Sequence, residues 1–239
     1  MSNVSCEKVL LKISGASLGN DKNGFDLSVF KEVAKQIKEL VHSGIKVAIV
    51  VGGGNVWRGS LGASYHLDPV KADYLGMTST LYNGYLLEGL LKQIGVKSVV
   101  YSAVRVKNLT KKYSKIFARQ DLQAGKVVIL VGGTGKPFCT TDTAASLRAS
   151  ELGIDTILMG KNGVDGVYSD DPRVNKKARK FDHLTYDEIL EKKLRVVDDT
   201  SIEICKKNNI KMLVFNINDM DNINRVIKEE SIGTLIEGE

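Results

Sequence analysis

Short runs of consecutive apolar residues alternate along this chain with segments in which apolar residues recur every three or four positions. Residues 9–13 form the first run, which only Lys12 interrupts, as is typical of a strand buried on both faces of a sheet. The next apolar residues have helical spacing and would share one face of a helix: Phe30, Val33, Ile37 and Leu40. Gly44 follows them, and glycine often ends a helix in the left-handed conformation. The chain therefore begins with a predicted strand and a predicted helix.

The same alternation continues to the end of the chain. Further strands are predicted at residues 45–51, 96–101, 126–131, 156–159, 212–215 and 234–236. Helices are predicted at residues 75–91, at residues 120–123 and from Thr140-Thr141-Asp142 onward. Thr185-x-x-Glu188 and Thr200-x-x-Glu203 indicate capping boxes that open two later helices. This order predicts an α/β fold, a three-layer αβα sandwich with a central, mainly parallel sheet.

Three of the predicted strands end in glycine-rich turns, within residues 9–15, 47–54 and 127–135. In a parallel sheet with right-handed crossovers, such turns lie along one edge. Gly52-Gly53-Gly54 has no side chains that would keep a phosphate away from backbone N–H groups, and Arg58 adds a planar cation nearby. One such turn is equally consistent with an ordinary connection between a strand and a helix. Three of them, two with a nearby basic residue, favour phosphate binding.

Three charged residues at the ends of predicted elements suggest phosphoryl transfer, which needs cations and N–H groups gathered at one place. Lys12 lies in an apolar strand, where it is unfavourable unless it faces a site or the exposed strand end. Lys161 follows the strand predicted at residues 156–159 and is the candidate for a second cation. Asp142 stands at a predicted helix start, where it either caps the helix or holds the two lysines in place.

Charge and composition narrow the class of protein. The chain has 239 residues, a net charge of +6 and 43% hydrophobic residues, and no apolar run is long enough to span a membrane. Basic residues gather at positions 105–119 and 173–180, which fits a solvated surface or an anionic substrate such as a nucleotide. Only Tyr113 and Phe117 are interleaved with them, which disfavours nucleic-acid binding through stacked bases. The N-terminus lacks the features of a signal peptide.

Familiar catalytic and metal-binding motifs are absent. Gly135-Lys136 is followed by Pro137, so the P-loop pattern fails, and Trp57 and Phe138 stand where the dinucleotide pattern needs a third glycine. The three histidines lie in unrelated contexts: His42, His66 and His183. The three cysteines form no paired motif: Cys6, Cys139 and Cys205. No metal ligands are predicted, and a reduced, cytoplasmic protein is expected.

Five ordered segments carry a resemblance to a known family. They are Lys12-Ile13-Ser14-Gly15, Gly52-Gly53-Gly54-Asn55-Val56-Trp57-Arg58-Gly59, Asp73-x-x-Gly76-Met77, Gly133-Thr134-Gly135-Lys136-Pro137-Phe138-Cys139-Thr140-Thr141-Asp142, and Asn162-Gly163-Val164-Asp165-Gly166-Val167-Tyr168-Ser169-Asp170-Asp171-Pro172. Together they extend over nearly the whole chain, which resembles the amino acid kinase superfamily. Gly76-Met77 and Pro137-Phe138 make the resemblance closest to the bacterial UMP kinase branch.

The resemblance implies a single domain, residues 1–239, that transfers the γ-phosphate of ATP to UMP in pyrimidine nucleotide biosynthesis. Its acceptor-binding part would cover residues 1–150 approximately, and its ATP-binding part residues 151–239. The implied ATP contacts are Lys12, Ile13, Ser14, Gly15, Gly54, Arg58, Asn162, Tyr168 and Asp171. The implied UMP contacts are Gly53, Asp73, Thr134, Gly135, Lys136, Pro137, Phe138, Cys139, Thr140 and Thr141. Catalytic roles would fall to Lys12, Arg58, Asp142 and Lys161.

The resemblance also implies Mg²⁺ held by the nucleotide phosphates, a homohexamer, activation by GTP and inhibition by UTP. Three positions depart from the family pattern. Ala16 replaces a glutamate, Lys136 replaces an asparagine, and residues 19–25 match only weakly the stretch that relatives link to GTP activation.

Two other functions fit parts of the sequence. An enzyme of the same fold with a carbamate or acyl amino acid acceptor is one, although the carboxylate of Asp73 would be poorly placed for such an acceptor. A nucleotide-sensing regulator that contacts DNA through its basic clusters is the other. Salt-sensitive DNA binding without turnover would favour that second function.

Overall fold

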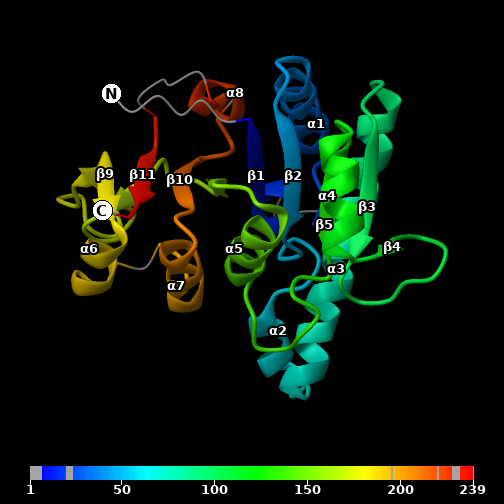
Figure 1. Cartoon of the computed structure of the whole chain (residues 1–239). Helices are drawn as coiled ribbons and strands as arrows, with labels where there is room; N and C mark the ends of the chain where they lie inside the picture. Colours follow the sequence, from blue (N-terminus) through cyan, green and yellow to red (C-terminus); the bar gives the residue numbers. More distant parts are fainter. Residues whose placement is uncertain (1–6, 20–23, 195, 220, 228–231, 239) are drawn as a thin grey trace.

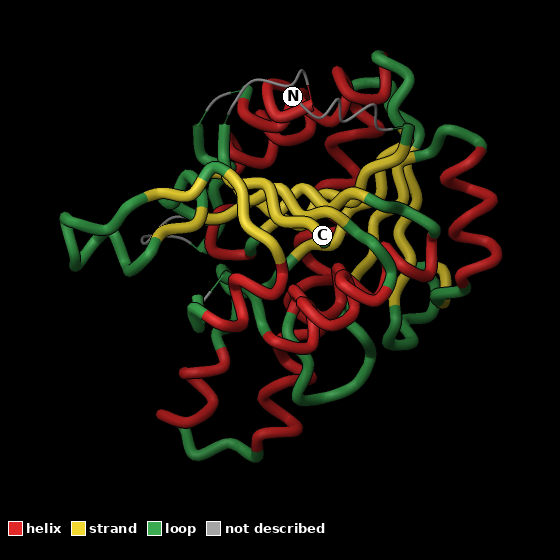
Figure 2. The backbone as a smooth tube through the Cα atoms, turned by 60° about the vertical axis from the view of Figure 1, so that its left-hand side comes forward, coloured by secondary structure: helices red, strands yellow, loops and turns green. Residues whose placement is uncertain are grey.

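A central sheet divides the molecule into three layers, with helices on both of its faces (Figures 1 and 2). The structure is a computed structural model that describes residues 7–19, 24–194, 196–219, 221–227 and 232–238. Within these residues, the main sheet has nine strands in the order β4-β3-β5-β2-β1-β6-β10-β11-β9. The predicted α/β sandwich is therefore confirmed.

The strands of the sheet are parallel except at one place. The parallel strands are β1 (Lys8–Ile13), β2 (Lys46–Val51), β3 (Ser98–Ser102), β4 (Lys111–Lys112), β5 (Val127–Val131), β6 (Thr156–Lys161) and β10 (Lys211–Asn216). Strand β11 (Thr234–Glu237) runs antiparallel to β10, and β9 (His183–Thr185) then runs parallel to β11. The carboxyl ends of β1, β2, β5, β6 and β10 consequently meet at one edge, as expected for a mainly parallel sheet.

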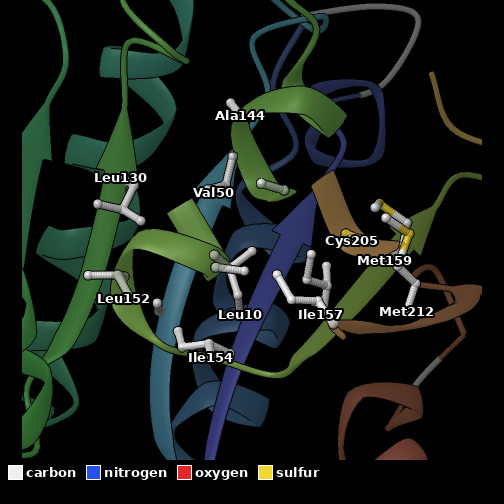
Figure 3. Close-up of a cluster of buried hydrophobic side chains, with 14 of the residues drawn as sticks. Leu10, Val50, Leu130, Ala144, Leu152, Ile154, Ile157, Met159, Cys205 and Met212 are labelled. Carbon is white, nitrogen blue, oxygen red and sulfur yellow. The ribbon is translucent and has the colours of Figure 1, made fainter. Parts of the chain in front are cut away.

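Alternation along β1 separates two hydrophobic cores, one on each face of the sheet. Val9, Leu11 and Ile13 belong to the core beneath α1 (Leu27–His42), α3 (Pro69–Gln93) and α8 (Asn222–Ile227). Leu10 belongs to the opposite core with Ala144, beneath α4 (Lys115–Gln123), α5 (Thr141–Leu152), α6 (Tyr186–Glu191) and α7 (Asp199–Lys207), as Figure 3 shows in part. Because side chains alternate along a strand, Lys12 shares the face of Leu10 and points toward α5.

Several short elements have no counterpart in the predictions, because they carry too few apolar residues to show a period. They are the 3₁₀ helix η1 (Gly15–Leu18), α2 (Gly59–Ser64), α8, the strands β4 and β9, and a small hairpin of β7 (Val167–Tyr168) and β8 (Lys180–Phe181). Two predicted helices are longer than expected, since α3 begins at Pro69 and α4 at Lys115. The Asp68 side chain caps α3 by accepting from the Lys71 N–H, and Pro69 fits the first helical turn.

One of the two predicted capping boxes is confirmed and the other is wrong. Thr185 Oγ1 accepts from the Glu188 N–H, and the Glu188 carboxylate accepts from the Thr185 N–H at the start of α6. Helix α7, by contrast, is capped by Asp198, whose carboxylate accepts from the Ser201 N–H, so Thr200 lies inside the first turn. Because the Asp198 carboxylate already accepts from an N–H group at the start of α7, this helix does not need Thr200 as its cap.

Asp121 of α4, which contacts strands β3 and β4 near one edge of the sheet, is expected to make a pH-dependent contribution to stability. Its carboxylate lies 2.7 Å from Lys126 Nζ and 3.0 Å from Lys111 Nζ, and it accepts a hydrogen bond from the Tyr101 hydroxyl. Burial alone would raise the pKa of Asp121, but these donors outweigh burial and lower it to about 2. Because the folded pKa is depressed, the stabilisation is present above pH 4 approximately and is lost as pH falls toward 2.

We therefore expect Asp121→Asn to lower the free energy of unfolding by about 2 kcal/mol at pH 7. Urea denaturation at pH 7 and at pH 2 measures the difference, most of which should vanish at the lower pH. Glu203→Gln is the control, since Glu203 is exposed and has no ion pair among the described residues. An equal loss of stability at both pH values would contradict this role of Asp121.

Candidate active site

The first two glycine turns are packed against each other at the carboxyl ends of β1 and β2. A Cβ atom on Gly15 would lie 2.2 Å from Gly54 N and 2.8 Å from the Gly53 carbonyl carbon. A Cβ atom on Gly52 would similarly lie 2.7 Å from Gly15 N. The neighbouring atoms are backbone, so only glycine fits, and the two turns bring their N–H groups to one place. The prediction that these turns lie along one edge of the sheet is confirmed.

A buried ion cluster lies beside these turns. Asp142 Oδ1 lies 2.7 Å from Lys12 Nζ, and Asp142 Oδ2 lies 3.5 Å from Lys161 Nζ. Lys12 is only 6% exposed, and Lys161 Nζ also donates to the Val196 carbonyl. Of the two roles considered for Asp142, the structure has it contacting both lysines. Thr140 performs the capping, since its Oγ1 accepts from the Asp142 and Thr143 N–H groups.

The charges of this cluster depend on one another. Burial alone would raise the pKa of Asp142, but Lys12 and then Lys161 outweigh it and hold the pKa below its ordinary value. Burial lowers the pKa of Lys161 below its ordinary value, partly opposed by the charge of Asp142. Two ammonium groups share one carboxylate, so the cluster has an excess of positive charge where an anion would approach.

Asp198 was missed by the sequence predictions, although it holds the start of α5. Its carboxylate accepts from the hydroxyls of Thr140 at 2.5 Å and Thr143 at 2.9 Å, while it also caps α7. Asp198 therefore joins the first turns of the two helices and supports the backbone that carries Asp142. The available signal was the Asp198-x-x-Ser201 spacing, which is typical of a helix cap.

The remaining predicted phosphate-binding residues lie at the first two glycine turns. Ile13 ends β1, and Ser14 precedes η1. Arg58 is exposed and donates from Nε to the Gly54 carbonyl at 3.0 Å, so its guanidinium is tied to the second turn. The structure describes no contact between Arg58 and either lysine. Residues 20–23, within the stretch compared with a GTP-linked region, lie outside the described residues.

The predicted acceptor segment, residues 134–141, lies between α3 and α5. Asp73 of α3 accepts from the Phe138 N–H through Oδ2 at 2.7 Å, and Thr134 Oγ1 accepts from the Lys136 N–H. Phe138 has a φ of 62° and its side chain is 77% exposed. Gly53 packs on the same helix, because a Cβ there would lie 2.6 Å from Ser79 Cβ. The other predicted members lie in this segment: Gly135, Pro137, Cys139 and Thr141.

A cavity of about 610 Å³ lies beside Lys161. Its lining includes the three predicted adenosine contacts, Asn162, Tyr168 and Asp171. The Tyr168 hydroxyl donates to Asp165, and the Asp171 carboxylate accepts from the Arg173 guanidinium. Asn162 Oδ1 accepts from the Asn218 side chain at 2.5 Å. Asn218 was not predicted, because it comes from the loop after β10 and carries no motif.

Other kinds of site are not found in the described part of the chain. No three His, Cys, Asp or Glu side chains lie together there as a metal ion would require. Among the described helices, none combines the length and the apolar character needed to cross a membrane.

Comparison with known proteins identifies the class to which this fold and site belong. Residues 7–216 match the model of the amino acid kinase family. The chain belongs to this family, as its ordered motifs predicted.

Individual relatives define the likeness more closely. The chain is 45% identical over 240 residues to a uridylate kinase of Limosilactobacillus reuteri, and the alignment covers all of both chains. It is similar to the structure of a UMP kinase from Ureaplasma parvum, with a TM-score of 0.92, 38% identity and coverage of 97% of this chain and 99% of that one. The UMP kinase structure from Bacillus anthracis has a TM-score of 0.94, 33% identity and coverage of 98% and 96%.

Proposed function

We propose that this protein transfers the γ-phosphate of ATP to UMP and forms ADP and UDP. The observation that carries the proposal is the Lys12–Asp142–Lys161 cluster at the edge where two glycine turns meet. Such an edge offers cations and backbone N–H groups to phosphates. The full-length similarity to uridylate kinases supports UMP as the acceptor.

The two substrates would take opposite sides of the ion cluster within one domain, residues 1–239. UMP would bind in the part up to residue 150 approximately, between the acceptor segment at 134–141 and Asp73. Asp73 Oδ1 has no hydrogen-bond partner among the described residues, so it is available to a ribose or base donor. The adenosine of ATP would occupy the cavity lined by Asn162, Tyr168 and Asp171, in the part from residue 151 onward.

The chain's own groups suit an in-line transfer. The attacking oxygen belongs to the phosphate of UMP, whose second pKa is near 6, so it is largely ionised at pH 7 and needs no general base. The task is then to overcome repulsion between two anions, for which Lys12, Lys161, Arg58 and the glycine N–H groups are suited.

The residues present also fit Mg²⁺ carried in by the nucleotide. The Asp142 carboxylate is occupied by two lysines, so phosphate oxygens would be the main ligands of the ion. Bound in that way, Mg²⁺ supplies further neutralisation of phosphate charge.

The proposal extends to the setting of the enzyme. We infer a cytoplasmic homohexamer in pyrimidine nucleotide and CTP biosynthesis that is inhibited by UTP. These properties follow from the resemblance of the ordered motifs to the UMP kinase branch.

ADP release from ATP and Mg²⁺ with UMP, CMP, carbamate or acetylglutamate tests the function. Turnover with UMP is expected. Turnover with carbamate or acetylglutamate alone would contradict the proposed acceptor while leaving the phosphotransferase class intact. No turnover with any acceptor would favour the regulator.

Asp73→Asn is expected to raise the KM for UMP by about 10- to 100-fold and to leave the KM for ATP nearly unchanged. Asparagine keeps an oxygen that can accept from the Phe138 N–H, so the segment should hold its shape while the carboxylate charge is lost. Steady-state kinetics with each substrate varied in turn measures both constants. Equal changes in the two KM values would argue against an acceptor-specific role.

A further inference from the structure

Residues 132–133 form a turn immediately before the acceptor segment, which we call the acceptor turn. Hydrogen bonds to two helices fix its position. Gly132 and Gly133 have φ values of 76° and 58°, so both adopt the left-handed backbone conformation. The Gly132 N–H donates to Thr80 Oγ1 of α3 at 2.7 Å, and the Gly133 carbonyl accepts from Arg148 Nη2 of α5 at 3.2 Å. Glycine has the greatest backbone freedom, so the shape of this turn depends on such outside contacts.

Arg148 is a buried cation whose orientation is fixed on several sides. Its side chain is 6% exposed, and Nη1 donates to Glu151 Oε2 at 2.6 Å. Its guanidinium carbon lies 3.9 Å from the centre of the Tyr113 ring, a cation–π contact. The Tyr113 hydroxyl donates to the same Glu151 oxygen at 2.6 Å, and burial and then Glu151 raise the pKa of Tyr113, which keeps it a donor. A planar fork with these partners has little freedom to turn.

The segment that carries Tyr113 also covers the acceptor turn. A Cβ atom on Gly132 would lie 3.0 Å from Val104 N, and one on Gly135 would lie 3.2 Å from the Ala103 carbonyl oxygen. The Tyr113 N–H donates to the Ser102 carbonyl and anchors the far end of that segment. Arg148 therefore lies where three parts of the chain meet: residues 103–113, the acceptor turn and α5.

We propose that Arg148 is a positioning residue for the acceptor, through the Gly133 carbonyl that it holds. Arg148 and Asp142 stand on the same helix, so this hydrogen bond fixes the acceptor segment relative to the ion cluster. The proposal rests on the proposed function for the identity of the acceptor.

Arg148→Met keeps an apolar stem and removes the hydrogen bond, the stacking and the charge. We expect the KM for UMP to rise about tenfold or more, with the KM for ATP within about twofold of the wild-type value. Arg119→Met is the matched control, because Arg119 Nε donates to the Glu151 carbonyl and Arg119 does not contact the acceptor turn. It should leave both constants unchanged. Equal changes in both KM values, or none in a folded Arg148→Met protein, would overturn the proposal.

Hydrogen exchange without substrates separates this proposal from the proposed function. In Arg148→Met, the amides of Gly135 and Phe138 should exchange about tenfold faster, while those of β1 should not change. Should Arg148→Met fail to fold, Arg148→Lys and Tyr113→Phe replace it, since they lose the planar fork or one hydroxyl only. Absence of UMP turnover in the wild type would refute the proposed function and leave exchange to decide on Arg148. Unchanged exchange in every folded variant would refute the role of Arg148.

Discussion

Lys12→Met is expected to lower kcat by about 10²–10³-fold, with a smaller effect on the KM values. The ammonium group is buried beside the glycine turns and is positioned toward charge that develops during transfer. Methionine fills most of the same space and removes only the charge, so the sheet around β1 should keep its shape. Measurement of kcat at saturating ATP and UMP gives the effect.

Loss of stability must be separated from this loss of rate. Lys12→Met leaves Asp142 buried with Lys161 as its remaining partner, and breaking a buried ion pair costs about 3 kcal/mol. Thermal unfolding should show this cost as a lower Tm of Lys12→Met, so kcat is compared at a temperature at which both proteins are folded. A near-normal kcat in folded Lys12→Met would show that Lys12 acts only in folding.

Gly15→Ala is expected to lower kcat/KM for ATP by about 100-fold and stability by about 1–3 kcal/mol. The added Cβ would lie within 3 Å of backbone atoms of Gly52, Gly53 and Gly54, and backbone cannot rotate away as a side chain can. The two turns must therefore separate, and their N–H groups would no longer converge. Calorimetry and steady-state kinetics with ATP varied measure the two effects.

Gly89→Ala is the matched control, because Gly89 lies in α3 with nothing within 4 Å of an added Cβ. This change should leave kinetics unaltered and stabilise the protein by up to about 1 kcal/mol. If Gly15→Ala behaves like Gly89→Ala, the contact between the two turns does not organise the site.

Sequence patterns predicted the central sheet well because buried parallel strands are continuous apolar runs. The same patterns placed the glycine turns along one edge, since parallel strands share a direction. Lys12 could be recognised as unusual because a lysine is unfavourable within such a run. The sequence could suggest Asp142 as the partner of Lys12 only as one of two possible roles, the other being a helix cap.

The parts that could not be predicted depend on contacts between distant segments. Asn218 and Arg148 form hydrogen bonds to residues 56 and 15 positions away in the chain, and no local period marks them. Asp198 had a local signal as a helix cap, but that signal does not indicate its hydrogen bonds to Thr140 and Thr143. The prediction of a capping box at Thr200 is wrong for a different reason. Asp198, two residues earlier, caps the helix instead. Strand β11 is antiparallel because it returns beside β10, which a short apolar run cannot indicate.

The place of β1 within the sheet has a consequence for the growing chain on the ribosome. Leu10 pairs with Ala48 of β2 on one side and with Ile157 of β6 on the other. The first partner emerges soon after β1, whereas the second appears only when most of the chain has been made. Until then β1 is an edge strand with Lys12 beside no carboxylate partner, since α5 also follows late. The ion cluster can thus be completed only after Lys161 has been made, and a shorter nascent chain lacks its central charges however well its first strands have paired.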